Sequence, residues 1–134
     1  MAREPLRRAA VRRGVAPVAV DADAFGTVHA ELRRIMLDAA PDGAIATDDP
    51  GDLTVRTGAT DPKTGQPGWF GTVTIKKRYV AYHLMPLYAD PALADGLSDA
   101  LARRRQGKTC FNFTRSDAAL FDELRALSLR AAGR

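Results

Sequence analysis

Residues 69–85 read Trp69-Phe70-Gly71-Thr72-Val73-Thr74-Ile75, then Lys76-Lys77-Arg78, then Tyr79-Val80-Ala81-Tyr82-His83-Leu84-Met85. The two outer runs are rich in β-branched and aromatic residues, which favour strands, and three charged residues separate them. This stretch therefore predicts a β-hairpin. Alternation along its first strand places Trp69, Gly71, Val73 and Ile75 on one face of the sheet and Phe70, Thr72 and Thr74 on the other.

Further periodic segments flank the hairpin on both sides. Residues 48–52 are rich in Asp, Pro and Gly and predict a turn, and the Gly- and Pro-containing residues 57–68 predict a long loop. Elsewhere apolar residues recur with helical spacing or alternate as in strands. We expect helices over residues 23–39, 91–104 and 117–131, and further strands over residues 53–56 and 108–113.

The order of these elements, α-β-β-β-α-β-α, predicts an α+β two-layer sandwich. A hairpin requires antiparallel pairing, and amphipathic helices must bury their apolar stripes, so we expect a mainly antiparallel sheet with helices on one face. Periodicity leaves open whether the last strand, at 108–113, pairs parallel or antiparallel. A sheet of this size has exposed edges, and pairing of two edges in a homodimer is one way of covering them.

Composition limits the class of protein. A chain of 134 residues with 46% hydrophobic residues has material for one domain, which we place at residues 21–134. Its apolar runs are shorter than the roughly 18 residues that a membrane-spanning helix needs, so we expect no membrane partner. Cys110 is the only cysteine, which precludes an internal disulfide and favours the reducing cytoplasm. We expect neither a metal nor a cofactor.

The net charge of +4 is concentrated near the N-terminus. Five basic residues and one acidic residue lie within residues 1–13, and the rest of the chain carries 15 basic and 15 acidic residues. We expect residues 1–20 to form a basic, flexible leader. Weak nucleic-acid binding through this leader is an alternative, which we favour less because no aromatic residue is interleaved for base stacking.

The C-terminal half resembles a known family. Residues 107–113, Gly-Lys-Thr-Cys-Phe-Asn-Phe, precede the acidic-apolar segment 117–124, and the strand end Tyr82–Pro86 lies upstream. Over residues 69–129 the chain resembles the YdhG-like (DUF1801) domains, which are mostly uncharacterised bacterial proteins. One branch is described as a frataxin-like iron chaperone, a role that needs a carboxylate ridge. Here the acidic residues of the first predicted helix are interrupted by Arg33 and Arg34, so we do not expect that role.

Cys110 and His83 are the candidate catalytic residues. An imidazole beside a thiol can activate it as a nucleophile, which requires the two residues to lie on neighbouring strands and on the same face. This pair is the basis of an alternative function, a thiol-dependent enzyme. We favour a buried thiol at Cys110 and a hydrogen-bonded His83, since lone cysteines are often simply buried. His29 we place at the boundary of its helix's apolar stripe, with one ring edge in water.

The polar face of the predicted sheet is the leading candidate for a binding site. Small polar and aromatic side chains on an uncovered sheet face can contact a ligand or a partner, although such a face can also be merely solvated. We therefore predict a non-enzymatic module that binds a small molecule or a protein, with the loop at 57–68 beside the site. The candidate ligand-binding residues are Trp69, Thr72, Thr74, Tyr82, His83, Lys108 and Asn112.

Overall fold

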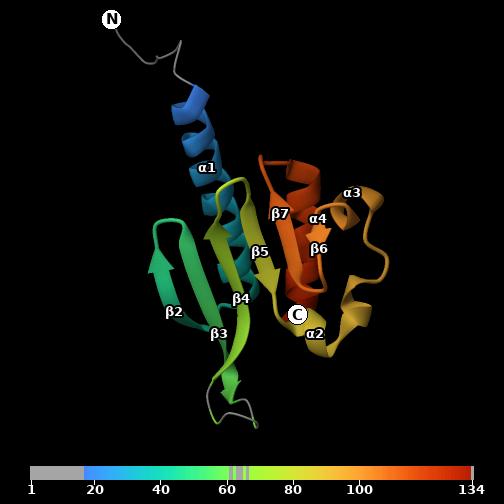
Figure 1. Ribbon diagram of the computed structural model, residues 1–134. Helices are drawn as coiled ribbons and strands as arrows, with labels where there is room; N and C mark the ends of the chain where they lie inside the picture. Colours follow the sequence, from blue (N-terminus) through green and yellow to red (C-terminus); the bar gives the residue numbers. More distant parts are fainter. Residues whose placement is uncertain (1–16, 61, 63–64, 66, 134) are drawn as a thin grey trace, which may run out of the picture.

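The computed structural model describes residues 17–60, 62, 65 and 67–133, which form one antiparallel sheet with helices on one of its faces (Figure 1). The strand order is β2-β3-β4-β5-β7-β6. This confirms the predicted α+β class, and the last long strand pairs antiparallel with β5. The elements are α1 (Pro17–Ala39), β2 (Ala44–Asp49), β3 (Asp52–Thr60), β4 (Pro67–Ile75), β5 (Val80–Leu84), α2 (Pro86–Ala89), η2 (Pro91–Ala94), α3 (Asp99–Ala102), β6 (Arg105–Gln106), β7 (Cys110–Phe113) and α4 (Ala118–Ala131).

The predicted central hairpin is confirmed as β4 and β5. Ile75 pairs with Val80 and Gly71 pairs with Leu84. The turn is closed by the backbone N–H of Lys76, which donates to the carbonyl of Tyr79 at 2.8 Å. Both strands lie in the middle of the sheet, so their inward side chains form the centre of the core.

A second hairpin, β2–β3, was not predicted. Residues 48–52 were expected to be only a turn, yet Asp48 and Asp49 belong to β2. The turn is reduced to Pro50-Gly51, with Gly51 at φ 77°, because proline followed by a residue of positive φ suits a type II turn. Ala and Asp have low strand propensity, so β2 forms through its pairing with β3 and gives no local signal.

The predicted loop at residues 57–68 is also shorter than expected. β3 continues to Thr60 and β4 begins at Pro67, with Thr60 paired to Pro67. Much of the expected loop is therefore strand, and residues 61, 63–64 and 66 lie outside the described part of the chain.

The predicted helix over residues 91–104 is wrong. In its place the chain forms η2 and α3, with Gly96 at φ 82° between them. A helix cannot continue through a left-handed residue, so α3 has to start anew. Ser98 caps this new start by accepting a hydrogen bond from the N–H of Leu101 at 3.1 Å. Arg105, the residue that follows the predicted helix, begins strand β6.

The two long helices differ from expectation only at their ends. α1 begins at Pro17, six residues before the predicted start, so residues 17–20 are helical although we had expected them in the leader. α4 is capped by Asp117, whose side chain accepts from the N–H of Leu120 at 3.1 Å. Thr114 and Ser116, which also precede α4, do not cap it.

A β-bulge reverses part of the predicted alternation in β4. Val55 pairs with Gly71 but Arg56 pairs with Trp69, so Phe70 is the extra residue. Because a bulge shifts the residues on its two sides out of phase, Phe70 is buried with Val73 while Trp69 is 44% exposed. The prediction had assigned Trp69 to the face of Val73 and Phe70 to the face of Thr72.

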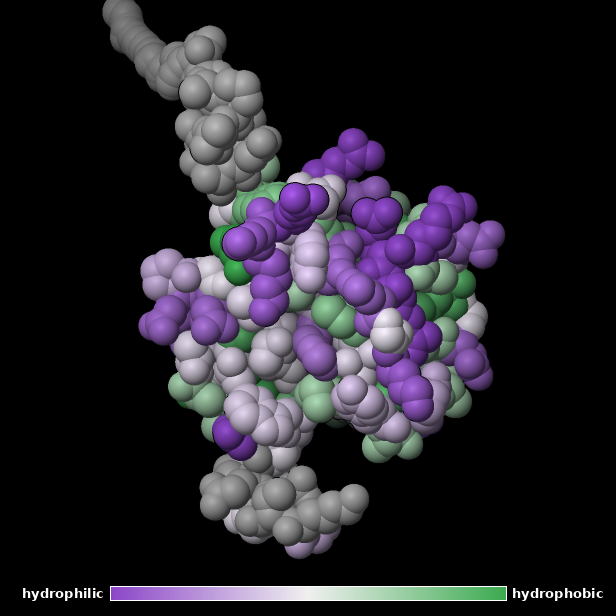
Figure 2. All heavy atoms as spheres, in the orientation of Figure 1, coloured by the Kyte–Doolittle hydropathy of each residue, from purple (hydrophilic) through white to green (hydrophobic). Residues whose placement is uncertain are grey.

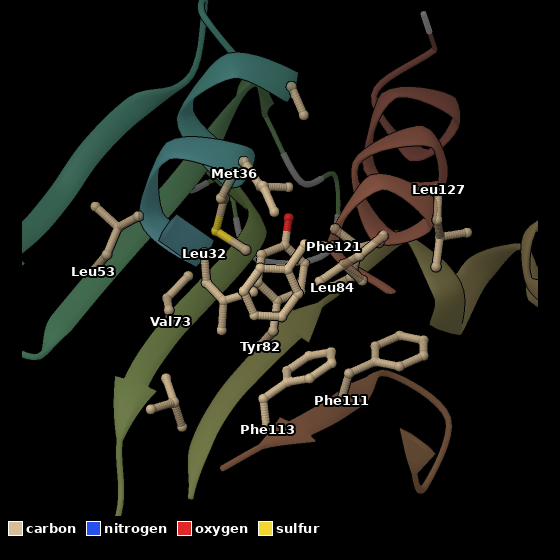
Figure 3. Packing of buried hydrophobic residues seen from close by; sticks show 14 of the residues in the cluster. Leu32, Met36, Leu53, Val73, Tyr82, Leu84, Phe111, Phe113, Phe121 and Leu127 are labelled. Carbon is tan, nitrogen blue, oxygen red and sulfur yellow. The ribbon is translucent and has the colours of Figure 1, made fainter. Parts of the chain in front are cut away.

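The core lies between the sheet and the helices α1 and α4 (Figure 3). The apolar stripe of α1 contributes Leu32 and Met36, and α4 contributes Phe121 and Leu127, as their helical spacing predicts. Phe111 and Phe113 of β7 are both buried, and the ring of Phe113 meets that of Phe121 edge-on with centroids 5.1 Å apart. The helices α1 and α4 both lie on this one face of the sheet, which leaves the other face without helical cover.

Tyr82 brings a hydroxyl group into this core. Its side chain is fully buried, and its oxygen lies 2.6 Å from Oγ of Ser128 on α4. Ser128 donates its own proton to the carbonyl of Leu124 at 2.8 Å, so Tyr82 is the donor in the first bond. Burial raises the pKa of Tyr82 above its ordinary value, which keeps the hydroxyl protonated as this donor role requires.

We expect Tyr82→Phe to lower the free energy of unfolding by about 1 kcal/mol, the usual net value of one buried hydrogen bond. Ser128→Ala should cost about 2 kcal/mol, because it leaves the Tyr82 hydroxyl buried without an acceptor. The double variant should lose less than the sum of the two. Urea unfolding measures all three, and strictly additive losses would contradict the hydrogen bond.

Gly71 on β4 has the nearest neighbouring atoms of the glycines that the structure describes. A Cβ built there would lie 2.4 Å from the backbone oxygen of His83 and 2.5 Å from Cε of Met36. We expect Gly71→Ala to lower the free energy of unfolding by about 2 kcal/mol, since overpacking against backbone cannot relax easily. Gly26→Ala is the matched control, because a Cβ there meets nothing within 4 Å; it should stabilise α1 by about 0.5–1 kcal/mol. Equal effects in thermal unfolding would refute this packing.

Candidate functional site

The uncovered side of the sheet, which we call the open face, carries polar residues from every strand. The register places six of them in one row across the sheet, because directly paired residues point to the same side. The inward neighbours of the row, such as Val73 and Phe111, are buried. In strand order the row is Thr47, Thr54, Thr72, His83, Cys110 and Gln106.

A second row runs beside the first and is also polar. It contains Asp52 and Thr74, whose hydroxyl lies 3.4 Å from Oδ1 of Asp52, and continues to Ala81 and Asn112. Asn112 donates from Nδ2 to Oε1 of Gln106 at 2.6 Å. The open face is therefore lined by hydroxyl, amide, imidazole and thiol groups, with the carboxylate of Asp52 at its β3 end.

Five of the seven candidate ligand-binding residues lie on this face. Trp69, Thr72, Thr74, His83 and Asn112 come together there from strands β4, β5 and β7. Tyr82 does not, because it precedes His83 in the strand and so points to the opposite side, into the core. Lys108 is exposed in the turn between β6 and β7, at the end of the face.

Trp69 gives the open face its one exposed aromatic ring among the described residues. The guanidinium carbon of Arg56, the residue paired with it on β3, lies 3.8 Å from the centre of the indole ring. This stacking is a cation–π contact and holds the ring at the end of β4. The bulge at Phe70 is what turns Trp69 to this side.

His83 and Cys110 lie directly opposite one another on β5 and β7, as a nucleophile–base pair would require. Each of the two side chains, however, forms its hydrogen bond with a third residue. His83 Nε2 shares a hydrogen bond with the hydroxyl of Thr109, and Cys110 Sγ lies 3.3 Å from Oδ1 of Asn112, to which it donates. The imidazole and the thiol are therefore engaged by other partners.

The electrostatics also oppose an activated thiol. Burial raises the pKa of the Cys110 thiol, which the positive charge of Lys76 only partly offsets. Burial lowers the pKa of His83, so the ring favours its neutral form. A neutral thiol beside a neutral imidazole is the resting state of this pair at neutral pH, and its thiolate is scarce.

We expect the alkylation rate of Cys110 to rise with pH and to reach half its maximum only above about pH 8.5, the ordinary thiol pKa, because burial raises the pKa of this thiol. His83→Gln should leave this pH profile unchanged, because the imidazole does not activate the thiol. Iodoacetamide labelling followed by mass spectrometry measures the rate. As a control, Ala30→Cys in a Cys110→Ala background places a thiol at an exposed site on α1. Rapid alkylation of Cys110 near pH 6 that depends on His83 would contradict this expectation.

His29 was expected at a helix boundary with one ring edge in water, but only 6% of it is exposed. Its Nε2 lies 3.0 Å from the carbonyl oxygen of Val73, so the ring ties α1 to the inner side of β4. Nowhere in the described part of the chain do three His, Cys, Asp or Glu residues gather as metal ligands would. Within the same residues, none of the helices combines the length and the apolar character needed to cross a bilayer.

Two features of the molecule were missed from the sequence. Gln106 joins the open face only because β6 forms, and β6 replaces an expected helix end. A groove of about 900 Å³ lies on the other side of the molecule, between α1 and α4, and is lined in part by Gly26, Ala30 and Ala118. Small residues on two helices predict such a groove only once the helices are known to be neighbours.

Comparison of the chain with protein-family models, curated proteins and solved structures found no match. The resemblance of residues 69–129 to the YdhG-like domains therefore stays a prediction.

Proposed function

We propose that this chain is a non-enzymatic binding module of the cytoplasm that receives a macromolecular partner on its open face. The observation that carries the proposal is the continuous polar row from Thr47 to Gln106 on a sheet face without helical cover. Directional hydrogen-bonding groups on a rigid sheet suit recognition of a partner, because they need little ordering on binding.

A macromolecule suits this face better than a small molecule. Small-molecule sites are concave and enclose most of their ligand. The cavities between α1 and α4 and at the end of α4 are lined by helix and loop residues such as Ile35, Phe121 and Ala132, and lie away from the polar row. Trp69, half exposed at one end of the face, is the kind of aromatic residue that interfaces favour.

The alternative of a thiol-dependent enzyme has less support. Cys110 and His83 are opposite one another, but the raised pKa of the thiol and the hydrogen bond between His83 and Thr109 both disfavour a reactive thiolate. The other alternative, nucleic-acid binding through the basic leader, concerns residues 1–13, which lie outside the described residues.

Cys110 supplies a reporter for the proposal, because it is the only cysteine and lies in the polar row. We expect an extract of cells that express the chain to slow alkylation of Cys110 several-fold at alkaline pH. Thr54→Arg should abolish this protection, since a long charged side chain on β3 would obstruct the face while leaving the core intact. Quantitative mass spectrometry of the labelled peptide measures the rate.

The Ala30→Cys, Cys110→Ala chain is the matched control, because its thiol lies at the groove between the helices. Its alkylation should be the same with and without extract. If the extract protects both positions equally, or protects neither, the open face is not a binding surface.

A further inference from the structure

The near-neutral body of the chain conceals a strong separation of charge. Residues 103–115 contain five basic and no acidic residues, and residues 76–78 are all basic. The sheet brings these two segments together, because Val80 pairs with Phe113 and the tip of the β4–β5 hairpin therefore lies beside the end of β7. We call the cluster the basic end; it consists of Lys76, Lys77, Arg78, Arg103, Arg104 and Arg115.

All six side chains of the basic end are exposed. Three of them, Arg103, Arg104 and Arg115, surround a hollow of about 200 Å³ with Phe113 and Thr114 at its side. Figure 2 shows the most hydrophilic side chains gathered over this part of the molecule, around the hairpin tip and the β6–β7 side of the sheet. The hollow is large enough for a phosphate group.

These arginines form no ion pair with any carboxylate that the structure describes. The described ion pairs join Arg33 to Asp48 and Arg125 to Asp38, on other parts of the molecule. Asp117 also lines the hollow, but its carboxylate already caps α4 through the N–H of Leu120. Asp49 and Asp52 lie at the same end of the sheet, on the β2–β3 side of the hairpin tip. Around the hollow itself the three arginines repel one another, so a bound anion would stabilise this part of the fold.

We propose that the basic end binds the phosphate groups of a single-stranded nucleic acid. The arginine guanidinium presents parallel N–H groups that match phosphate oxygens, and the hairpin lysines add further positive charge. The basic end borders the open face, where hydroxyl and amide groups such as those of Thr74 and Asn112 can meet the edges of unpaired bases. The choice of a nucleic acid as the ligand thus rests on the proposed function of the open face. The phosphate contacts rest on the basic end alone.

Other anionic partners fit the basic end less well. Membrane binding needs apolar side chains beside the basic residues, to enter the lipid. The large apolar side chains that are exposed in the described residues are Ile45, Trp69 and Tyr88. All three lie at the ends of the strands that are opposite to the basic end. Ile45 is near the start of β2, Trp69 is near the start of β4, and Tyr88 comes just after β5.

The proposal is tested by adding the full-length chain to a fluorescent oligothymidylate of about 20 nucleotides and measuring the fluorescence anisotropy of the oligonucleotide. We expect Arg103→Glu with Arg104→Glu to weaken binding at least about tenfold at low salt. The slope of log affinity against log salt concentration should also decrease by about 1.4, because each single-strand phosphate contact contributes about 0.7. Circular dichroism checks folding, and Arg103→Gln with Arg104→Gln replaces the first variant if it does not fold.

Two double variants that change the net charge equally serve as controls. Arg34→Glu with Arg130→Glu alters the helical layer, and Arg7→Glu with Arg8→Glu alters the leader. Both should bind within about twofold of the unmodified chain, apart from a small effect of net charge. Equal weakening by all three pairs, or weakening by the leader pair alone, would overturn the proposal.

Competition separates the chemical classes. We expect polyglutamate of equal charge to displace the oligonucleotide poorly, since it has no bases to contact the open face. Equal displacement by polyglutamate, or tighter binding to phosphatidylserine vesicles than to the oligonucleotide, would overturn the proposal. The Cys110 alkylation rate in the presence of the oligonucleotide reports separately on the open face. Binding that depends on Arg103 and Arg104 but leaves Cys110 unprotected therefore supports the phosphate contacts and counts only against the open face.

Discussion

The packing of α1 and α4 against a single face of the sheet is the constraint on which the rest of the structure depends. Both helices are amphipathic, and Leu32 and Phe121 meet the inward side chains of β4, β5 and β7. Since strand residues alternate between the two faces, covering one face with helices forces polar residues onto the other. The hydrogen bond between Tyr82 and Ser128 links the central strand to α4 within this core.

The same constraint assembles both candidate surfaces. The register that buries Phe111 and Tyr82 also sets Cys110 opposite His83 on the outer side, where other hydrogen bonds hold them. The tip of the β4–β5 hairpin lies beside the chain that follows β7, because Val80 pairs with Phe113. Basic residues about 30 positions apart in sequence therefore share one end of the sheet. Equal numbers of basic and acidic residues over positions 14–134 are then compatible with a locally cationic surface, because the segregation of charge depends on topology and not on composition.

Sequence patterns predicted the parts whose signal is local. The apolar stripes of α1 and α4, the β4–β5 hairpin and the burial of Phe113 all follow from periodicity within one segment. The errors arose where distant residues decide: β2 forms only by pairing with β3, and the bulge at Phe70 exchanges its side with that of Trp69. Tyr82 was a candidate ligand-binding residue together with His83, yet it is buried, since adjacent strand residues point to opposite sides and the register turns His83 outward.

By itself the sequence determined the class of fold, the central hairpin and most of the core, because hydrophobic periodicity and strand propensity act over a few neighbouring residues. Only the tertiary structure decided which polar residues share a surface, since that depends on strand order, on register and on a single inserted residue in β4. The position of Gln106 on the open face and the gathering of Arg103, Arg104 and Arg115 around one hollow are consequences of that pairing.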